Sequence, residues 1–178
     1  MDVLNKDQVQ LLTIGAWTVW IGRNNELHER AQEPTQQGWK PPPTGLHKLK
    51  FDGAVNVEGK VGGIGVIIRD SKGLVTRTYV SKWPWITEAL TIETIAALRA
   101  LEVAKVMGIN EVIMEGDNLT LMNRLNISLQ NNSSPGVLIE EICILARQFR
   151  SFKAVHTGRK GNEAAHKLAR LGLQAQEG

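Results

Sequence analysis

The sequence contains a single cysteine, Cys143, among its 178 residues. One cysteine excludes an internal disulfide, and a chain without disulfides fits a reducing, intracellular compartment, here the nucleus or the cytoplasm. Cys143 lies inside the apolar stretch of residues 138–145. We interpret it as a small buried core residue, although a lone cysteine could also act as a nucleophile.

Features that direct a chain into or through a membrane are also missing. Residues 1–7 are acidic where a signal peptide needs a basic start. The apolar run of residues 11–21 is too short for a bilayer span, and polar residues follow it. Hydrophobic residues make up 42% and charged residues 22% of the chain, which are the proportions of a globular protein rather than a disordered one.

Acidic residues are scarce between residues 147 and 170, where Glu163 is the single acid. The formal net charge of the whole chain is only +3, so its distribution is more informative than its size. The basic residues of this region are Arg147, Arg150, Lys153, Arg159, Lys160, Lys167 and Arg170. Their clustering indicates either a polyanionic partner or a solvated helix face.

The spacing of apolar residues divides the chain into three parts. Residues 1–30 contain an amphipathic helical segment, expected over residues 10–30. Residues 31–47 are rich in proline and glutamine and form an extended linker. Residues 48–178 form one domain, in which antiparallel strands come first and α/β crossovers follow. This order predicts an α/β fold with a mixed sheet and helices on both faces.

The expected elements of the domain alternate in a simple order along the chain. The expected strands are residues 48–55, 62–69, 74–80, 111–115 and 152–156. The expected helices are residues 86–107, 118–125, 135–149 and 162–173.

Three carboxylates occupy positions where acids are uncommon or where ligands bind. Asp52 stands in the middle of the first expected strand, and Glu93 interrupts the apolar stripe of the long helix. Asp117 follows the fourth strand at its carboxyl end, where open α/β sheets bind ligands, although it could instead cap the next helix. Carboxylates that converge repel one another unless hard cations such as Mg²⁺ lie between them. If they converge within reach of one ion, they can serve metal-assisted phosphoryl transfer.

Several short motifs follow one another in the order and spacing of a known family. They are FDGA at residues 51–54, GGIGVIIRD at 62–70, Glu93 with the alanine-rich residues 96–101, EGDN at 115–118, and the closing stretch 156–170. Together they resemble the plant ribonuclease H-like domain found at the end of many non-LTR retrotransposon reading frames and in stand-alone genes. Residues 17–24 are similar to the W-x-x-W-x-x-R-N segment that precedes this domain. That similarity implies that residues 1–30 are a remnant of an upstream reverse-transcriptase region.

The resemblance implies a ribonuclease H-like fold, in which three antiparallel strands and then parallel strands form a five-stranded mixed sheet. It also implies an endonuclease that cleaves the RNA strand of RNA–DNA hybrids with two Mg²⁺ or Mn²⁺ ions, and we expect the protein to be a monomer. Asp52 would bridge both ions, and Glu93 and Asp117 would complete one metal site. His156 would assist proton transfer or product departure, or it is a surface residue at a strand end. Asn162 would cap the last helix and, together with the basic residues of this region, contact nucleic acid.

One position departs from the pattern of the active family. His166 stands where the family has a fourth carboxylate, which normally holds the ion that activates water. Imidazole suits Zn²⁺ or Mn²⁺ better than Mg²⁺. Either the enzyme is then weak or prefers Mn²⁺, or the domain keeps the fold and binds nucleic acid without efficient cleavage. A third hypothesis is a structural remnant of a retroelement.

Overall fold

The computed structural model describes residues 40–131 and 136–175. The helical segment expected at residues 10–30, and the linker as far as residue 39, lie outside the described residues. Within the described ranges, no helix is long and apolar enough to cross a membrane.

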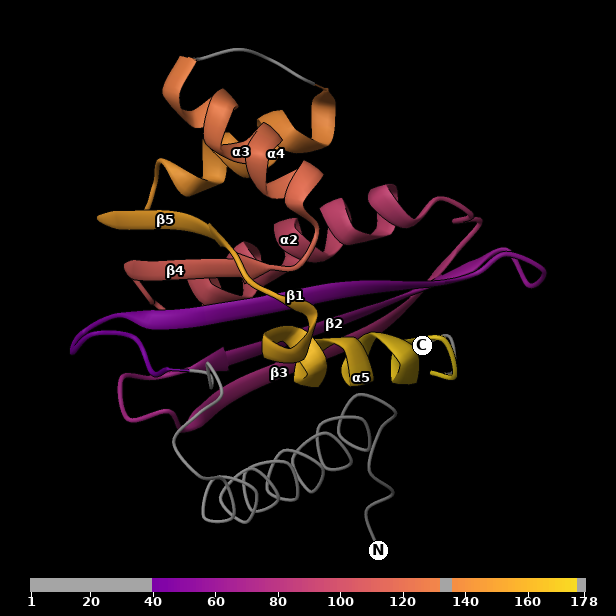
Figure 1. Ribbon diagram of the computed structural model, residues 1–178, viewed down its shortest axis with the longest axis horizontal. Helices are drawn as coiled ribbons and strands as arrows, with labels where there is room; N and C mark the ends of the chain where they lie inside the picture. Colours follow the sequence, from indigo (N-terminus) through magenta and orange to yellow (C-terminus); the bar gives the residue numbers. More distant parts are fainter. Residues whose placement is uncertain (1–39, 132–135, 176–178) are drawn as a thin grey trace, which may run out of the picture.

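A five-stranded sheet is the central element of the described chain (Figure 1). Its strands are β1 (His47–Asn56), β2 (Val61–Arg69), β3 (Val75–Pro84), β4 (Glu111–Gly116) and β5 (Ser151–His156). They lie in the order β3-β2-β1-β4-β5, with β3, β2 and β1 antiparallel and β4 and β5 parallel to β1. This arrangement confirms the expected mixed sheet.

Helices cover both faces of the sheet, as expected. The helices are α2 (Ala89–Val106), α3 (Leu119–Asn131), α4 (Val137–Ala146) and α5 (Glu163–Gly172), and a 3₁₀ turn, η1 (Arg159–Asn162), leads into α5. Figure 1 shows α2, α3 and α4 on one side and α5 on the other. Two neighbouring glycines of β2 lie against helices on opposite faces of the sheet. A Cβ at Gly62 would meet Ile92 of α2, and a Cβ at Gly63 would meet Ala169 of α5.

Some element boundaries differ from the expected ones. β3 continues to Pro84 and the long helix begins only at Ala89, because Trp85 adopts a left-handed backbone with φ of 62° that no helix continues. α3 extends to Asn131, beyond the expected end at residue 125. Leu125 and Ser128 are both buried on this helix, and their packing overrides the weak helix propensity of the asparagines around them.

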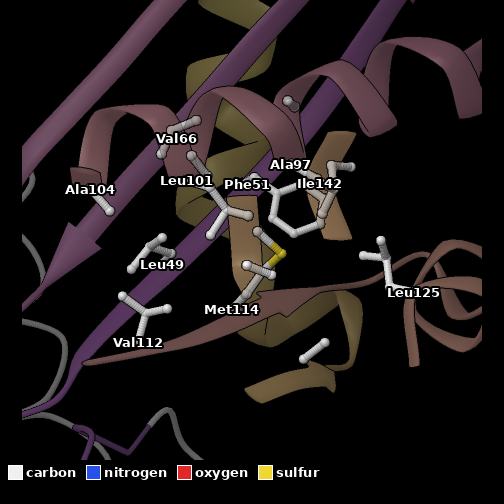
Figure 2. Packing of buried hydrophobic residues seen from close by; sticks show 14 of the residues in the cluster. Leu49, Phe51, Val66, Ala97, Leu101, Ala104, Val112, Met114, Leu125 and Ile142 are labelled. Carbon is white, nitrogen blue, oxygen red and sulfur yellow. The ribbon is translucent and has the colours of Figure 1, made fainter. Parts of the chain in front are cut away.

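The core lies between the sheet and α2, α3 and α4. Leu49 and Phe51 point to this side from β1 and pack with Leu101 and Met114 (Figure 2). Because side chains alternate along a strand, Asp52 projects to the opposite face, the side of α5. Burial of this apolar set, at roughly 25 cal/mol for each Å² removed from water, fixes the register of β1 and therefore the face on which Asp52 lies.

Two glycines of β2 allow α5 to lie directly on the sheet. A Cβ at Gly63 would come within 2.2 Å of the Ala169 carbonyl oxygen, and a Cβ at Gly65 within 2.3 Å of the Ala169 nitrogen. Gly65 is the cross-strand partner of Asp52. The close approach therefore brings the first turn of α5, which carries His166, over Asp52.

Candidate active site

The parting of two strands creates the space in which the candidate residues lie. β1 and β4 pair in parallel only as far as Lys50 and Glu115, and Asp52 and Asp117 each come two residues after that pair. Side chains from α2 on one face and from α5 on the other can approach these carboxylates around the unpaired edge of β1. The sheet topology thus brings Asp52, Glu93, Asp117 and His166 to one region.

Asp52 and His166 form a direct pair. The Nδ1 atom of His166 lies 2.7 Å from Oδ2 of Asp52, and their side chains are 35% and 5% exposed. The other carboxylate oxygen, Oδ1, accepts the backbone N–H of Gly53 at 2.8 Å. Both oxygens of Asp52 therefore already have a donor or a histidine ring beside them.

Glu93 is held by a residue that the sequence motifs did not single out for the site. The Nδ2 group of Asn118 donates to Glu93 Oε2 at 2.5 Å, while its Oδ1 accepts the N–H of Leu121 at 3.0 Å. Asn118 therefore caps α3 and orients Glu93 with one side chain. An asparagine immediately before a helix was the available sequence signal, but its second partner lies 25 residues away.

Asp117 does not cap the helix, since Asn118 does so. Its Oδ1 accepts the Nδ2 group of Asn162 at 3.0 Å, and that same group donates to the Phe51 carbonyl at 2.9 Å. The expectation that Asn162 caps the last helix is therefore wrong for its side chain: it occupies the first position before α5 but makes no capping bond there. The Phe51 carbonyl and the Asp117 carboxylate together attract its amide group instead.

Two further predicted residues lie beside Asp117. The Nε2 atom of His156 is 3.2 Å from the Asp117 carbonyl oxygen. The Nε atom of the exposed Arg159 is 3.9 Å from Asp117 Oδ2, close enough to reduce the negative potential of the region but too exposed to contribute much stability.

The three carboxylates influence one another electrostatically. Burial, with smaller contributions from Asp52 and Asp117, raises the pKa of Glu93 to about 7 against the opposing hydrogen bond from Asn118. Burial also raises the pKa of Asp52, and the charge on Asp117 acts in the same direction. Each of these groups would be stabilised in its charged form by a cation placed among them.

The donor chemistry suits a divalent cation, but the side chains do not converge on a common ligand point. Three carboxylates are the hard oxygen ligands that Mg²⁺ and Mn²⁺ accept. Among residues 40–131 and 136–175, however, no group of three or more histidine, cysteine or acidic side chains is placed to hold one metal ion. Asn118, Asn162 and His166 take up carboxylate oxygens instead. A cation bound here would have to displace some of these partners.

The remaining basic residues are spread over the surface rather than gathered at the carboxylates. Arg150 pairs with Glu111 at the start of β4, the opposite end of that strand from Asp117. Lys167 pairs with Glu163 within α5 at 2.8 Å. Only Arg159 of the predicted basic set has a contact with a site carboxylate in the described chain. The other members are Arg147, Lys153, Lys160 and Arg170, all of them exposed.

The raised pKa of Glu93 predicts how stability changes with pH in the absence of divalent cations. Because the folded state binds this proton more tightly than the unfolded chain, stability is highest below the ordinary value of 4.5 and falls as the pH rises through about 7. We expect Tm in EDTA to fall by roughly 2–5 °C between pH 5 and pH 8. In Glu93→Gln, which stays neutral, most of this fall should disappear.

The matched control is Glu58→Gln, in the exposed turn between β1 and β2. Calorimetry of the three proteins at several pH values provides the measurement. An equal slope of Tm against pH in the wild type and in Glu93→Gln would show that Glu93 ionises normally in the folded protein.

Known proteins share this fold and part of this sequence. Residues 50–172 match the model of the family described as "Reverse transcriptase-like". Ribonuclease H1 of the halophilic archaeon Halobacterium salinarum superposes with a TM-score of 0.61 at 21% identity, covering 72% of this chain and 98% of its own. The N-terminal ribonuclease H domain of Rv2228c from Mycobacterium tuberculosis gives a TM-score of 0.63 at 17% identity, covering 72% and 94%. No curated protein matches the sequence.

A third similar structure contains nucleic acid. It is LC11-RNase H1, isolated from compost by a metagenomic approach and solved in complex with an RNA/DNA hybrid. The TM-score is 0.59 at 22% identity, covering 72% of this chain and 96% of that chain. At these identities the likeness establishes a ribonuclease H-like fold.

Proposed function

The chain belongs to the reverse transcriptase-like family, and we propose that it is a metal-dependent endonuclease that hydrolyses the RNA strand of RNA–DNA hybrids. The observation that carries the proposal is the electrostatic coupling of Asp52 on β1, Glu93 on α2 and Asp117 just after β4, although the three side chains share no single ligand point in the described chain. Burial and mutual repulsion raise the pKa of Glu93 to about 7, and a fold gains nothing from such an arrangement unless a cation uses it. The similar fold that binds an RNA/DNA hybrid supports the choice of substrate.

Asp52, Glu93 and Asp117 would hold two Mg²⁺ or Mn²⁺ ions, with Asp52 shared between them. Such ions, when bound, neutralise charge at the phosphate and lower the pKa of water. His166 would contribute its imidazole in place of a carboxylate oxygen. Because imidazole is a softer ligand, the proposal includes a preference for Mn²⁺ over Mg²⁺.

The chain's own residues would orient the substrate and move protons. His156, exposed beside the Asp117 carbonyl, carries an imidazole that can transfer a proton and so assist departure of the product. The exposed guanidinium of Arg159 can bind a phosphate of the hybrid bidentately. Asn162 keeps Asp117 in position through its amide.

A second candidate function is a nucleic-acid-binding module with impaired catalysis. The contact between His166 Nδ1 and Asp52 Oδ2 at 2.7 Å favours it, because the imidazole already occupies a carboxylate oxygen that a bound cation would use. In this case the domain would bind hybrids through its basic surface and cleave them slowly or not at all.

Cleavage of a labelled RNA–DNA hybrid tests the proposal directly. We expect shortened RNA and intact DNA with Mn²⁺, less product with Mg²⁺, and none in EDTA. Binding without cleavage in either metal would support the impaired module. The absence of binding even at low salt would refute both functions and leave a structural remnant.

Phosphate contacts predict a steep dependence of hybrid binding on salt. Each basic side chain that neutralises a phosphate contributes about 1 to the slope of log K against log salt concentration. We expect Arg159→Ala to reduce this slope by about 1. Lys72→Ala, in the exposed turn between β2 and β3, is the control and should leave the slope unchanged. Fluorescence anisotropy at several salt concentrations measures both, and equal slopes for all three proteins would exclude Arg159 from the interface.

A further inference from the structure

We propose that Lys50 is a positioning residue of the candidate active site, because its buried ammonium group ties the turn before α5 to the sheet. Through that turn it holds Asn162, and through Asn162 it holds Asp117. This inference rests on the proposed nuclease function, since it assigns Lys50 a role in that reaction rather than a separate activity.

Lys50 lies where the two central strands part. It is the last β1 residue to pair with β4, opposite Glu115, and it is only 1% exposed. Its Nζ atom forms an ion pair with Glu115 Oε2 at 2.9 Å and donates to the carbonyl oxygen of Gly161. The ammonium group thus joins β1, β4 and the turn η1 immediately before the positions of Asp52 and Asp117.

Consecutive residues of β1 bond consecutive residues of the turn. Lys50 donates to the Gly161 carbonyl, and the Phe51 carbonyl accepts the amide of Asn162 at 2.9 Å. The same Asn162 amide group donates to Asp117 at 3.0 Å, while the Asn162 Oδ1 atom is buried without a hydrogen-bond partner in the described chain. An amide kept in place despite an unpartnered oxygen must be held by its other contacts, and the Lys50 bond to the preceding residue is one of them.

A charged lysine is a costly residue at this buried position. Burial lowers the pKa of the Lys50 ammonium, and Glu115 acts against that change. Burial alone would raise the pKa of Glu115, but the bonds from Lys48 and Lys50 bring it below its usual value. Removing one partner of a buried ion pair is usually destabilising, but in Lys50→Met the Glu115 carboxylate would keep its ion pair with Lys48. A methionine could therefore fill the space, but it could not bind the Gly161 carbonyl.

Lys48 offers a matched control on the same strand and the same face. It is also buried and pairs with the same carboxylate, since its Nζ atom is 2.8 Å from Glu115 Oε1. Its Nζ atom also donates to the carbonyl of Lys40 at 2.6 Å. Lys48→Met and Lys50→Met both remove a buried cation from Glu115, but only Lys50→Met removes the tie to Gly161.

The full chain carrying each substitution would be assayed on an RNA–DNA hybrid with Mn²⁺. We expect Lys50→Met to lower kcat roughly tenfold or more, because small displacements of reacting groups are costly, and to change KM by less than about threefold. Lys48→Met should change neither by more than about threefold. The side-chain amide signal of Asn162 in ¹⁵N–¹H spectra should shift in Lys50→Met and stay in place in Lys48→Met. If Lys50→Met melts below the assay temperature, Lys50→Gln, whose side chain is one bond shorter and uncharged, replaces it.

The two readouts separate the failure of this inference from the failure of the proposed function. An unmoved Asn162 signal in Lys50→Met, or an equal loss of kcat in both lysine variants, would overturn the positioning role. A wild type that cleaves no hybrid, combined with an Asn162 signal that shifts only in Lys50→Met, would leave the tie to the turn in place and overturn the nuclease.

Discussion

Substitution of Asp52 by asparagine should abolish hybrid cleavage, with a loss in kcat of at least about 10³-fold. Asparagine has nearly the same shape and can still accept the N–H of Gly53 that Asp52 Oδ1 accepts at 2.8 Å, but it cannot supply the negative charge that a cation at this point needs. The same change should not destabilise the fold, because burial raises the pKa of Asp52 and its charged form is the costly one. We therefore expect activity to disappear while Tm stays equal or rises.

The control for this experiment is Asp70→Asn. Asp70 caps the turn between β2 and β3 by accepting the N–H groups of Lys72 and Leu74, each at 2.9 Å, and asparagine can do the same. Cleavage and melting should both remain close to wild type. If Asp52→Asn retains more than about a tenth of the wild-type kcat, charge at Asp52 does not drive the reaction and the nuclease assignment is wrong.

Substitution of His166 by aspartate should increase the Mg²⁺-supported cleavage rate by about 10²-fold. The change replaces an imidazole 2.7 Å from Asp52 Oδ2 with a hard oxygen ligand that suits Mg²⁺. It also adds a negative charge to a region where burial and neighbouring carboxylates have already raised the pKa of Glu93 to about 7. We therefore expect lower stability in EDTA and a larger gain in Tm when Mg²⁺ is added.

His166→Ala separates the removal of the imidazole from the addition of a carboxylate. If the alanine variant gains as much Mg²⁺-supported activity as His166→Asp, the imidazole was only blocking Asp52 Oδ2. If His166→Asp loses activity in Mn²⁺ without gaining any in Mg²⁺, the imidazole of His166 itself contributes to the reaction. Rates with both metals for all three proteins distinguish these outcomes.

The sequence was sufficient for the elements with strong periodicity and for the residues whose chemistry conflicts with their position. Asp52 in a strand and Glu93 in an apolar stripe are conspicuous in this way, and the mixed sheet follows from the antiparallel start and the later crossovers. The hydrogen-bond partners of these residues could not be predicted from the sequence. Asn118 meets Glu93, and Asn162 meets Phe51 and Asp117, through contacts between residues 25 to 111 positions apart, and no local pattern encodes them.

Asn162 illustrates the limit most clearly. An asparagine before a helix predicts a cap, and its position before α5 agrees with this. Its side chain nevertheless turns to the Phe51 carbonyl and the Asp117 carboxylate, because the turn is brought against β1 by tertiary contacts. The extension of α3 to Asn131 has the same origin, since burial of Leu125 and Ser128 decides it.

The contact of α5 with Gly63 and Gly65 has a consequence for surveys of mutational tolerance. Any side chain at either glycine would enter the backbone of the helix at Ala169 and push His166 away from Asp52. In a saturation scan selected for cleavage, substitutions at Gly63 and Gly65 should therefore be lost as often as substitutions at the three carboxylates. Neither glycine can itself take part in the reaction. A scan selected only for protein abundance should lose substitutions at Gly63 and Gly65 but tolerate those at Asp52. The difference between the two scans would distinguish residues that take part in the reaction from residues that allow α5 to pack on the sheet.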